Sequence, residues 1–204
     1  MPTAAIWGAG GIANTHLDAL RSNGITVAAV VSRTEDGARA FAQRWGIPQW
    51  GSDPAILFAP EIDCVHICTP PNLHYEMAVT LLEQGKHVLC EKPLTLNAAQ
   101  AQSLFALARE RGLLLAEAMW TRTLPFAQAL RKTLADGRLG APRLVTAVLG
   151  EAMADIPRIA QPALGGGALL DIGVYALTLA CLALEGDVER VGGRVRSKRA
   201  GRGH

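Results

Sequence analysis

Three residues of this chain have types and positions that suit proton transfer. Asp171 and Tyr175 are four residues apart in an apolar segment that predicts a helix, so they share one helix face. An acid there needs a partner, and a tyrosine can donate a proton when a nearby cation stabilises its phenolate. Lys92 follows a short strand and could stabilise negative charge on a substrate oxygen. Purely structural roles, a capping Asp with a core Tyr and a surface Glu–Lys pair, are the alternatives.

A glycine-rich turn near the N-terminus predicts a dinucleotide site. The apolar strand 3–7 runs into Gly8-Ala9-Gly10-Gly11-Ile12-Ala13, which has the Gly-x-Gly-x-x-Ala spacing, and a helical pattern follows. Gly8 permits the tight turn, Gly10 lets a pyrophosphate approach the backbone, and Ala13 allows close packing of helix on strand. The helix N-terminus offers free N–H groups and partial positive charge to the phosphates. An ordinary glycine-rich turn is the alternative, but the strand–turn–helix context favours the cofactor.

The end of the second predicted strand favours NADP. In NAD sites an acid at this position commonly holds the ribose hydroxyls, whereas this strand ends with Ser32 and Arg33. A hydroxyl followed by a guanidinium suits a 2′-phosphate, because the guanidinium fork matches phosphate oxygens. A surface arginine that begins a helix is the alternative, and NAD stays possible.

The composition is that of a globular protein with a basic end. Half of the 204 residues are hydrophobic and 19% are charged, enough apolar surface for a core. Six of the 20 Lys and Arg residues fall in 190–204, which has no acid, and this leaves 14 basic and 18 acidic residues, a net charge of −4, in 1–189. With little apolar bulk, 190–204 is expected to be disordered.

Cysteine usage and apolar runs favour a cytoplasmic location. All four cysteines lie in apolar stretches, which predicts buried, reduced thiols. No basic-plus-apolar leader precedes the first strand, so no secretory signal is expected. The run 168–184 is strongly apolar, but Asp171 interrupts it and it is short for a membrane span. We therefore predict a core helix there and no membrane partner.

Alternating strand and helix patterns predict an α/β fold with a doubly wound parallel sheet, that is, a Rossmann domain over residues 1–122. Most of the strands lack polar alternation, as expected when helices cover both faces of the sheet. The expected strands are 3–7, 27–31, 49–50, 63–68, 87–90 and 113–117, and the expected helices are 12–22, 34–45, 54–58, 74–84 and 97–111. Beyond residue 122, helices 125–136 and 168–184 and a strand 143–149 predict an incomplete α+β C-terminal domain over 123–189.

Four motifs occur together in an order that resembles the Gfo/Idh/MocA oxidoreductases, and the resemblance covers about residues 3–188. They are the glycine turn, Thr69-Pro70-Pro71-Asn72 with His74, Glu91-Lys92-Pro93, and Asp171-Ile172-Gly173-Val174-Tyr175. The segment 117–122, and Tyr175 where many members have His, are similar to the subgroup that contains dimeric trans-dihydrodiol dehydrogenase and glucose–fructose oxidoreductase.

This resemblance implies an NAD(P)-dependent dehydrogenase that moves a hydride between nicotinamide and a hydroxyl-bearing carbon of a sugar, polyol or cyclic diol. Lys92 and Tyr175 would form the catalytic pair, supported by Asp171. No metal site is predicted. The implied cofactor-binding residues are Gly8, Gly10, Gly11, Ile12, Ala13, Ser32, Arg33, Thr69, Pro70, Asn72, His74, Glu91, Lys92, Trp120 and Arg122.

The chain departs from the family pattern at its C-terminal end. The family's second domain contains a large open antiparallel sheet, which commonly forms the dimer interface and the floor of the substrate pocket, whereas only 82 residues follow Arg122. We therefore expect a C-terminally truncated chain whose homodimer is doubtful, and we hypothesise that 190–204 is an out-of-frame or read-through segment. A nucleotide-binding remnant without turnover is the alternative function. Nucleic-acid binding is disfavoured, because the basic segment has no aromatic residue for stacking.

Overall fold

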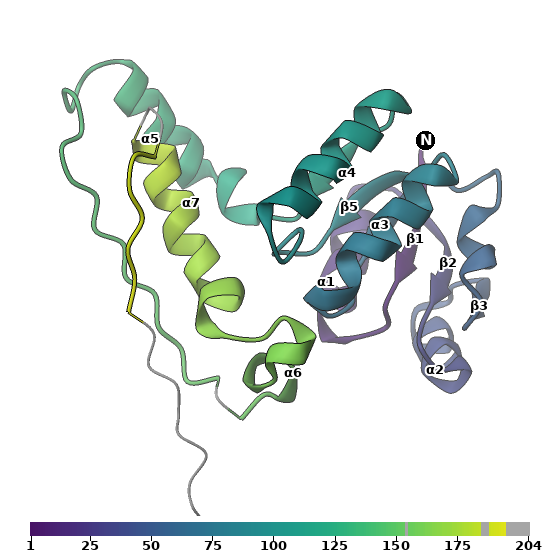
Figure 1. Ribbon diagram of the computed structural model, residues 1–204. Helices are drawn as coiled ribbons and strands as arrows, with labels where there is room; N and C mark the ends of the chain where they lie inside the picture. Colours follow the sequence, from purple (N-terminus) through teal and green to yellow (C-terminus); the bar gives the residue numbers. More distant parts are fainter. Residues whose placement is uncertain (154, 185–187, 195–204) are drawn as a thin grey trace, which may run out of the picture.

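The computed structural model describes residues 1–153, 155–184 and 188–194, and its centre is a parallel sheet (Figure 1). The strand order β3-β2-β1-β4-β5-β6, with every pair parallel, confirms the predicted Rossmann-type α/β fold. The strands are β1 (Thr3–Trp7), β2 (Thr26–Val31), β3 (Gln49–Gly51), β4 (Cys64–Ile67), β5 (His87–Cys90) and β6 (Leu115–Glu117). The crossover helices are α1 (Gly11–Ser22), α2 (Glu35–Trp45), α3 (His74–Glu83) and α4 (Ala98–Glu110), with a short helix η1 (Pro54–Phe58) before β4.

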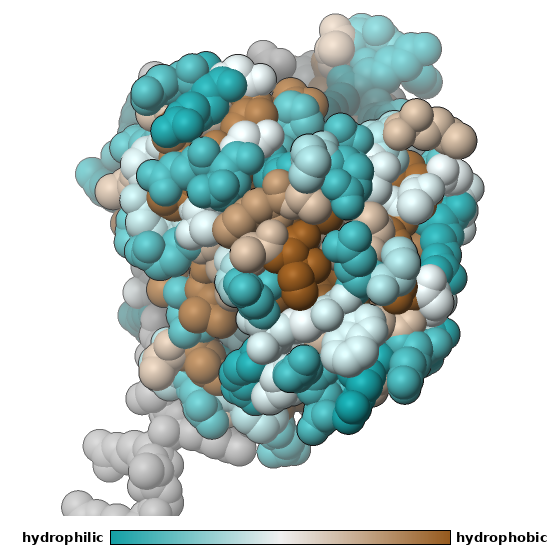
Figure 2. All heavy atoms as spheres, turned by 90° about the vertical axis from the view of Figure 1, so that its right-hand side faces the viewer, coloured by the Kyte–Doolittle hydropathy of each residue, from teal (hydrophilic) through white to brown (hydrophobic). Residues whose placement is uncertain are grey.

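Two apolar cores lie on opposite faces of the sheet, because successive strand side chains point to opposite sides. On β1, Ala4 and Ile6 pack into the core shared with α1 and α2. Ala5 and Trp7 join the other core, beneath α3, α4 and η1. The strands are therefore buried on both faces, which is why their sequences lack polar alternation. At the β3 edge, the face that carries α2 shows only small hydrophobic areas among hydrophilic ones (Figure 2).

The C-terminal part of the described chain is a set of helices beside the carboxyl ends of the strands (Figure 1). After β6, η3 leads into α5, which lies beside α7. Between them an irregular stretch leads to two short helices and a π-helical turn, η5, that continues directly into α7. The elements are η3 (Trp120–Arg122), α5 (Pro125–Ala135), α6 (Pro157–Ala160), η4 (Pro162–Leu164), η5 (Leu169–Gly173) and α7 (Val174–Ala183).

The strand predicted at 143–149 does not form. This segment pairs with no strand in the described part of the chain, and Leu144 and Val148 are 81% and 90% exposed. A strand gains its hydrogen bonds from a neighbour, so a sequence of strand-forming residues stays irregular where no partner strand lies beside it. Of the segment predicted to be disordered, 190–194 has no regular structure, and 195–204 lies outside the described residues.

The apolar helix near the C-terminal end is less buried than predicted. The helical run Pro162–Ala183 is long and apolar enough to cross a membrane by length and composition, and 11% of its most apolar window is buried. No residue of α7 is buried by the part of the chain that the structure describes, so the prediction of a core helix is wrong for this chain. Of its ten residues, eight are half-buried, and Leu177 and Cys181 are exposed. Cys181 is thus exposed, whereas Cys68 and Cys90 are buried.

Candidate active site

The glycine turn has the shape that a pyrophosphate requires. Gly8 adopts a φ of +111°, and a Cβ there would lie 2.7 Å from the carbonyl oxygen of Cys68, so only glycine fits between the ends of β1 and β4. A Cβ on Gly11 would meet nothing within 4 Å, so the space before the helix is open. Gly10 is the N-cap of α1 and brings no capping side chain, which leaves backbone N–H groups for an anion. Ala13 is fully buried against the sheet, as its small size predicts.

The loop after β4 faces this turn. The nearest side chain to a Cβ built on Gly8 is that of Thr69, at 2.9 Å, and Pro70 follows it. The Oδ1 atom of Asn72 is buried and has no hydrogen-bond partner among the residues that the structure describes. Because an orphaned buried acceptor costs free energy, this atom is suited to a donor from a bound molecule. The turn and this loop therefore fit a dinucleotide.

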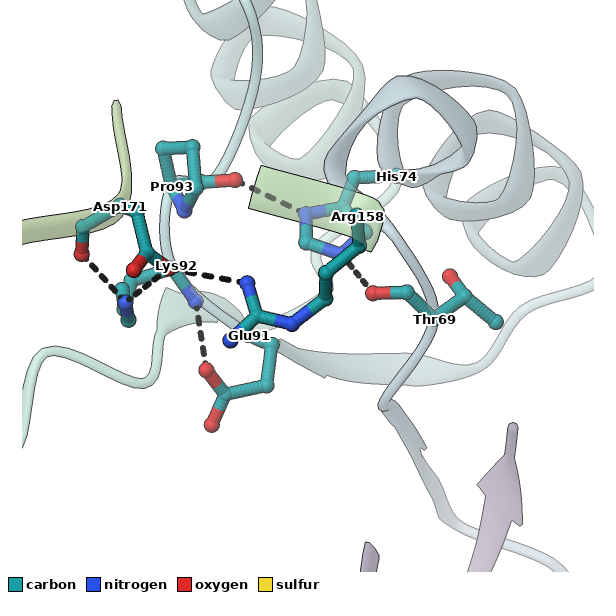
Figure 3. A network of polar contacts seen from close by, with 7 residues as sticks. All are labelled: Thr69, His74, Glu91, Lys92, Pro93, Arg158 and Asp171. Carbon is teal, nitrogen blue, oxygen red and sulfur yellow. Dashed lines mark hydrogen bonds and ion pairs between the residues drawn. The ribbon is translucent and has the colours of Figure 1, made fainter. Parts of the chain in front are cut away.

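His74, which was predicted to line the cofactor site, has a different place. Its side chain is completely buried, and its ring nitrogens lie 2.8 Å from the Pro93 carbonyl oxygen and 2.9 Å from that of Thr69 (Figure 3). Burial lowers the pKa of His74, although both carbonyls oppose the shift. The imidazole thus joins the loop after β4 to the loop that carries Lys92, and it cannot touch a cofactor directly.

The structure brings the three predicted catalytic residues together. The Lys92 ammonium donates to the backbone carbonyl of Asp171 at 2.5 Å and to its Oδ1 at 3.3 Å (Figure 3). The same nitrogen lies 5.0 Å from the centre of the Tyr175 ring. Lys92 and Asp171 are 79 residues apart in sequence, and both side chains are largely buried. An ammonium thus lies over the ring of the tyrosine that the sequence predicts as the proton donor.

Arg158 is a member of this site that the sequence did not reveal. It lies in α6, and its Nη1 donates to Oδ1 of Asp171 at 2.9 Å (Figure 3). Burial raises the pKa of Asp171, but the hydrogen bond from Arg158 and the charges of Lys92 and Arg158 outweigh it, so the pKa is below its usual value. Asp171 is therefore a carboxylate shared by two cations. The only sequence signal was an acid in an apolar helix, which calls for a partner without naming it.

A second missed feature is a pair of histidines, His16 and His66, next to Glu91. His16 of α1 lies 2.8 Å from Oε1 of Glu91 and 3.0 Å from His66 of β4. Glu91 accepts a hydrogen bond from the Lys92 backbone N–H at 3.1 Å (Figure 3). No spacing rule joins residues 16, 66 and 91, so only the fold places them together.

One cavity of about 820 Å³ is lined by Lys92, Tyr175 and the His16–His66–Glu91 group. It lies between α1, the middle strands, η3 and the start of α7. Among the residues that line it are Ile12, His16, His66, Glu91, Lys92, Trp120 and Tyr175. The implied catalytic pair and part of the implied cofactor site thus line the same cavity, whose volume is typical of small-molecule sites.

Of the fifteen implied cofactor residues, four line this cavity, namely Ile12, Glu91, Lys92 and Trp120. Ser32 and Arg33 follow β2, where Ser32 is half-buried and Arg33 is exposed, at the same edge of the sheet as the glycine turn. Arg122 instead lines a separate cavity of about 780 Å³ between α5 and α7. The structure therefore does not bring Arg122 to the site, since Trp120 and Arg122 of η3 line different cavities.

Comparisons with known proteins agree with this geometry. Residues 3–119 match the model of an oxidoreductase family with an NAD-binding Rossmann fold, and residues 127–203 match the GFO/IDH/MocA C-terminal domain. The chain is 35% identical over 191 residues to trans-1,2-dihydrobenzene-1,2-diol dehydrogenase of Xenopus tropicalis, covering 90% of this chain and 58% of that protein. The human protein of the same name is 40% identical over 161 residues, covering 78% and 48%.

Solved structures of similar proteins cover a comparable part of the chain. KijD10, a 3-ketoreductase from Actinomadura kijaniata solved with NADP and TDP-benzene, gives a TM-score of 0.77 at 38% identity, covering 89% of this chain and 57% of its own. An NAD-binding oxidoreductase from Klebsiella pneumoniae gives 0.75 at 27% identity, covering 90% and 53%. The chain thus spans about half the length of these relatives. It belongs, on its sequence and its fold, to the Gfo/Idh/MocA family of oxidoreductases.

Proposed function

We propose that this protein is an NADP-dependent oxidoreductase that acts on a hydroxyl-bearing carbon of a cyclic diol, polyol or sugar. The observation that carries the proposal is the contact of Lys92 with Asp171 and the Tyr175 ring in a cavity next to the glycine turn. When bound, the nicotinamide supplies or accepts the hydride. The dihydrodiol dehydrogenases and the ketoreductase that resemble this chain support the substrate class.

The residues of the chain have separate roles in this proposal. Tyr175 moves the proton between its Oη and the substrate oxygen, and the Lys92 ammonium lies over its ring. The same ammonium stabilises negative charge on that oxygen. Asp171 holds Lys92 in place through two acceptor atoms, and Arg158 fixes the Asp171 carboxylate. Trp120 and Ile12 close the cavity with apolar surface.

Arg33 is the residue that would select NADP. Its guanidinium is exposed at the end of β2, where the 2′-phosphate of a bound cofactor is expected. A thermal melt with saturating NADPH or NADH tests this, since a ligand of the native state raises the melting temperature. We expect NADPH to give the larger rise and Arg33→Gln to abolish the difference. Arg39→Gln is the matched control, because Arg39 is another exposed arginine of the same region, paired with Asp36.

Turnover is tested with cyclic diols, polyols and sugars and a nicotinamide cofactor. Tyr175→Phe and Lys92→Met are each expected to lower kcat about 10²- to 10⁴-fold, as loss of a general acid–base group does. The chain has one other tyrosine, Tyr75, whose hydroxyl accepts a bond from Ser103 away from the cavity, so Tyr75→Phe is the control. Equal activity of Tyr175→Phe and Tyr75→Phe would refute the assignment.

A nucleotide-binding remnant without turnover is the second candidate. Two observations favour it, namely that the chain spans about half the length of its relatives and that α7 has no buried residue in the described chain. This candidate predicts a rise in melting temperature with NADPH but no oxidation of any substrate in the panel. The same two experiments therefore separate the candidates.

A further inference from the structure

The pair His16 and His66 is a buried polar group of the cavity that the proposed reaction does not use. Both imidazoles are at most 9% exposed, and their rings meet edge to face at a centroid distance of 5.2 Å. Their Nδ1 atoms are 3.0 Å apart, and His16 Nε2 is 2.8 Å from Oε1 of Glu91. Helix α1 and the ends of β4 and β5 are thereby joined by one row of polar atoms.

The direction of the hydrogen bonds in this row follows from the acceptor at its end. An ionised carboxylate only accepts, so His16 must donate from Nε2 to Glu91. A neutral His16 then has only an acceptor at Nδ1, and His66 must donate to it from its own Nδ1. Burial, and then the nearby His16, lower the pKa of His66 to about 4, so His66 is neutral at physiological pH. The row therefore runs from His66 through His16 to Glu91.

Glu91 connects the two histidines to the catalytic lysine. Its Oε2 accepts the backbone N–H of Lys92 at 3.1 Å, while Oε1 is the atom that His16 holds. The Glu91 side chain is 13% exposed, so water offers it little alternative bonding. A change in its orientation would release the peptide of Lys92, whose ammonium must reach Asp171 and Tyr175.

We propose that His16 is a positioning residue, which holds Glu91 and through it the backbone of Lys92, and that His66 fixes the orientation of the His16 ring. This inference rests on the proposed function. A displacement of about 1 Å at a reacting group can cost about 100-fold in rate, so a residue that acts through the position of Lys92 can control kcat.

Two amide substitutions of His16 separate positioning from core packing. In His16→Gln the amide nitrogen reaches the place of Nε2 and can still donate to Glu91, whereas in His16→Asn it reaches only the place of Nδ1. We expect His16→Asn to lower kcat about 10- to 100-fold with little change in the KM for NADPH, and His16→Gln to keep kcat within about threefold of the unaltered chain. His87→Gln, at the opposite end of β5, is the control. Equal losses of kcat in both His16 variants, in step with their melting temperatures, would mean that His16 is only structural.

The tautomers of His16 and His66 test the proposed hydrogen bonds without a measurement of enzyme activity. In two-bond ¹H–¹⁵N spectra, recorded at a pH at which both rings give the nitrogen shifts of neutral imidazole, we expect His16 as the Nε2–H form and His66 as the Nδ1–H form. In His16→Asn the amide also accepts from His66, so the Nδ1–H form of His66 persists there, but in His16→Phe it is lost. A neutral His66 in the Nε2–H form in the unaltered chain would overturn the proposal.

Chemical labelling of Lys92 tests the positioning role of His16 even if the chain binds NADPH but has no catalytic activity. An N-hydroxysuccinimide ester acylates free amines, and peptide mass spectrometry gives the rate at Lys92 relative to the exposed Lys132. We expect His16→Asn to raise that relative rate and His16→Gln to leave it unchanged, because only the former releases Glu91. An unchanged rate in both would refute the positioning role, whereas failure of NADPH to bind would refute the proposed function alone.

Discussion

Acid should destabilise this protein partly through one imidazole, that of His66. Burial, and then the neighbouring His16, lower the pKa of His66 from 6.5 to about 4. Between those two values the unfolded chain carries a proton on this residue and the folded chain does not, so the stability is present above pH 6.5 and falls as the pH falls toward 4. A difference of this size amounts to about 3 kcal/mol of unfolding free energy at the acid end, which is a large part of a typical domain's roughly 5–15 kcal/mol.

Urea unfolding across that pH range, followed by tryptophan fluorescence, measures this loss. The informative variant is His66→Asn, whose amide can still bond to His16 but does not titrate. We expect the stability of the unaltered chain to fall by about 3 kcal/mol more than that of the variant. His74 shifts in the same direction and stays in both proteins, so the difference isolates His66. Identical pH dependence of the two proteins would refute the reasoning.

Three further substitutions test the fold by urea denaturation. Gly8→Ala forces a Cβ to 2.7 Å from the Cys68 carbonyl at a φ of +111°, and we expect a loss of about 1–3 kcal/mol or more. Lys86→Met removes a buried ammonium that donates to two backbone carbonyls, for an expected loss of about 2–4 kcal/mol. Leu104→Ala empties a fully buried position and should cost about 2–5 kcal/mol. A change below about 0.5 kcal/mol in any of them would contradict the corresponding contact.

The parallel sheet could be predicted because its signals are local. Strands covered on both faces are continuous apolar runs, so β1 and β5 begin and end as predicted. The glycine turn is equally local, since its tight turn requires Gly8, whose φ is positive and whose place leaves no room for a Cβ. The prediction of the β6 start was two residues early, at 113, where Leu113 packs into a core before the strand pairing begins.

The features that the sequence did not reveal depend on partners far along the chain. Arg158 and His16 are ordinary surface and helix residues by local pattern, and only the folded chain places them beside Asp171 and Glu91. The predicted strand at 143–149 failed for the same reason, because strand propensity requires a neighbour to be realised. The pattern of apolar residues specifies which face is buried, but it does not specify what covers it.

The position of β1 in the sheet has a consequence for how the protein forms during synthesis. β1 is made before the other strands of this sheet, yet it is a central strand, with β2 on one side and β4 on the other, and Ala4 lies opposite Cys64. The edge of β1 that pairs with β4 therefore has no partner until about sixty further residues have been made. The bond from Thr3 N–H to the Asp63 carboxylate spans the same separation. Because such non-local pairings slow folding, the nascent β1 must wait with one edge unpaired. Until β4 has been made, the edge of β1 that β4 later covers is thus open to chaperones.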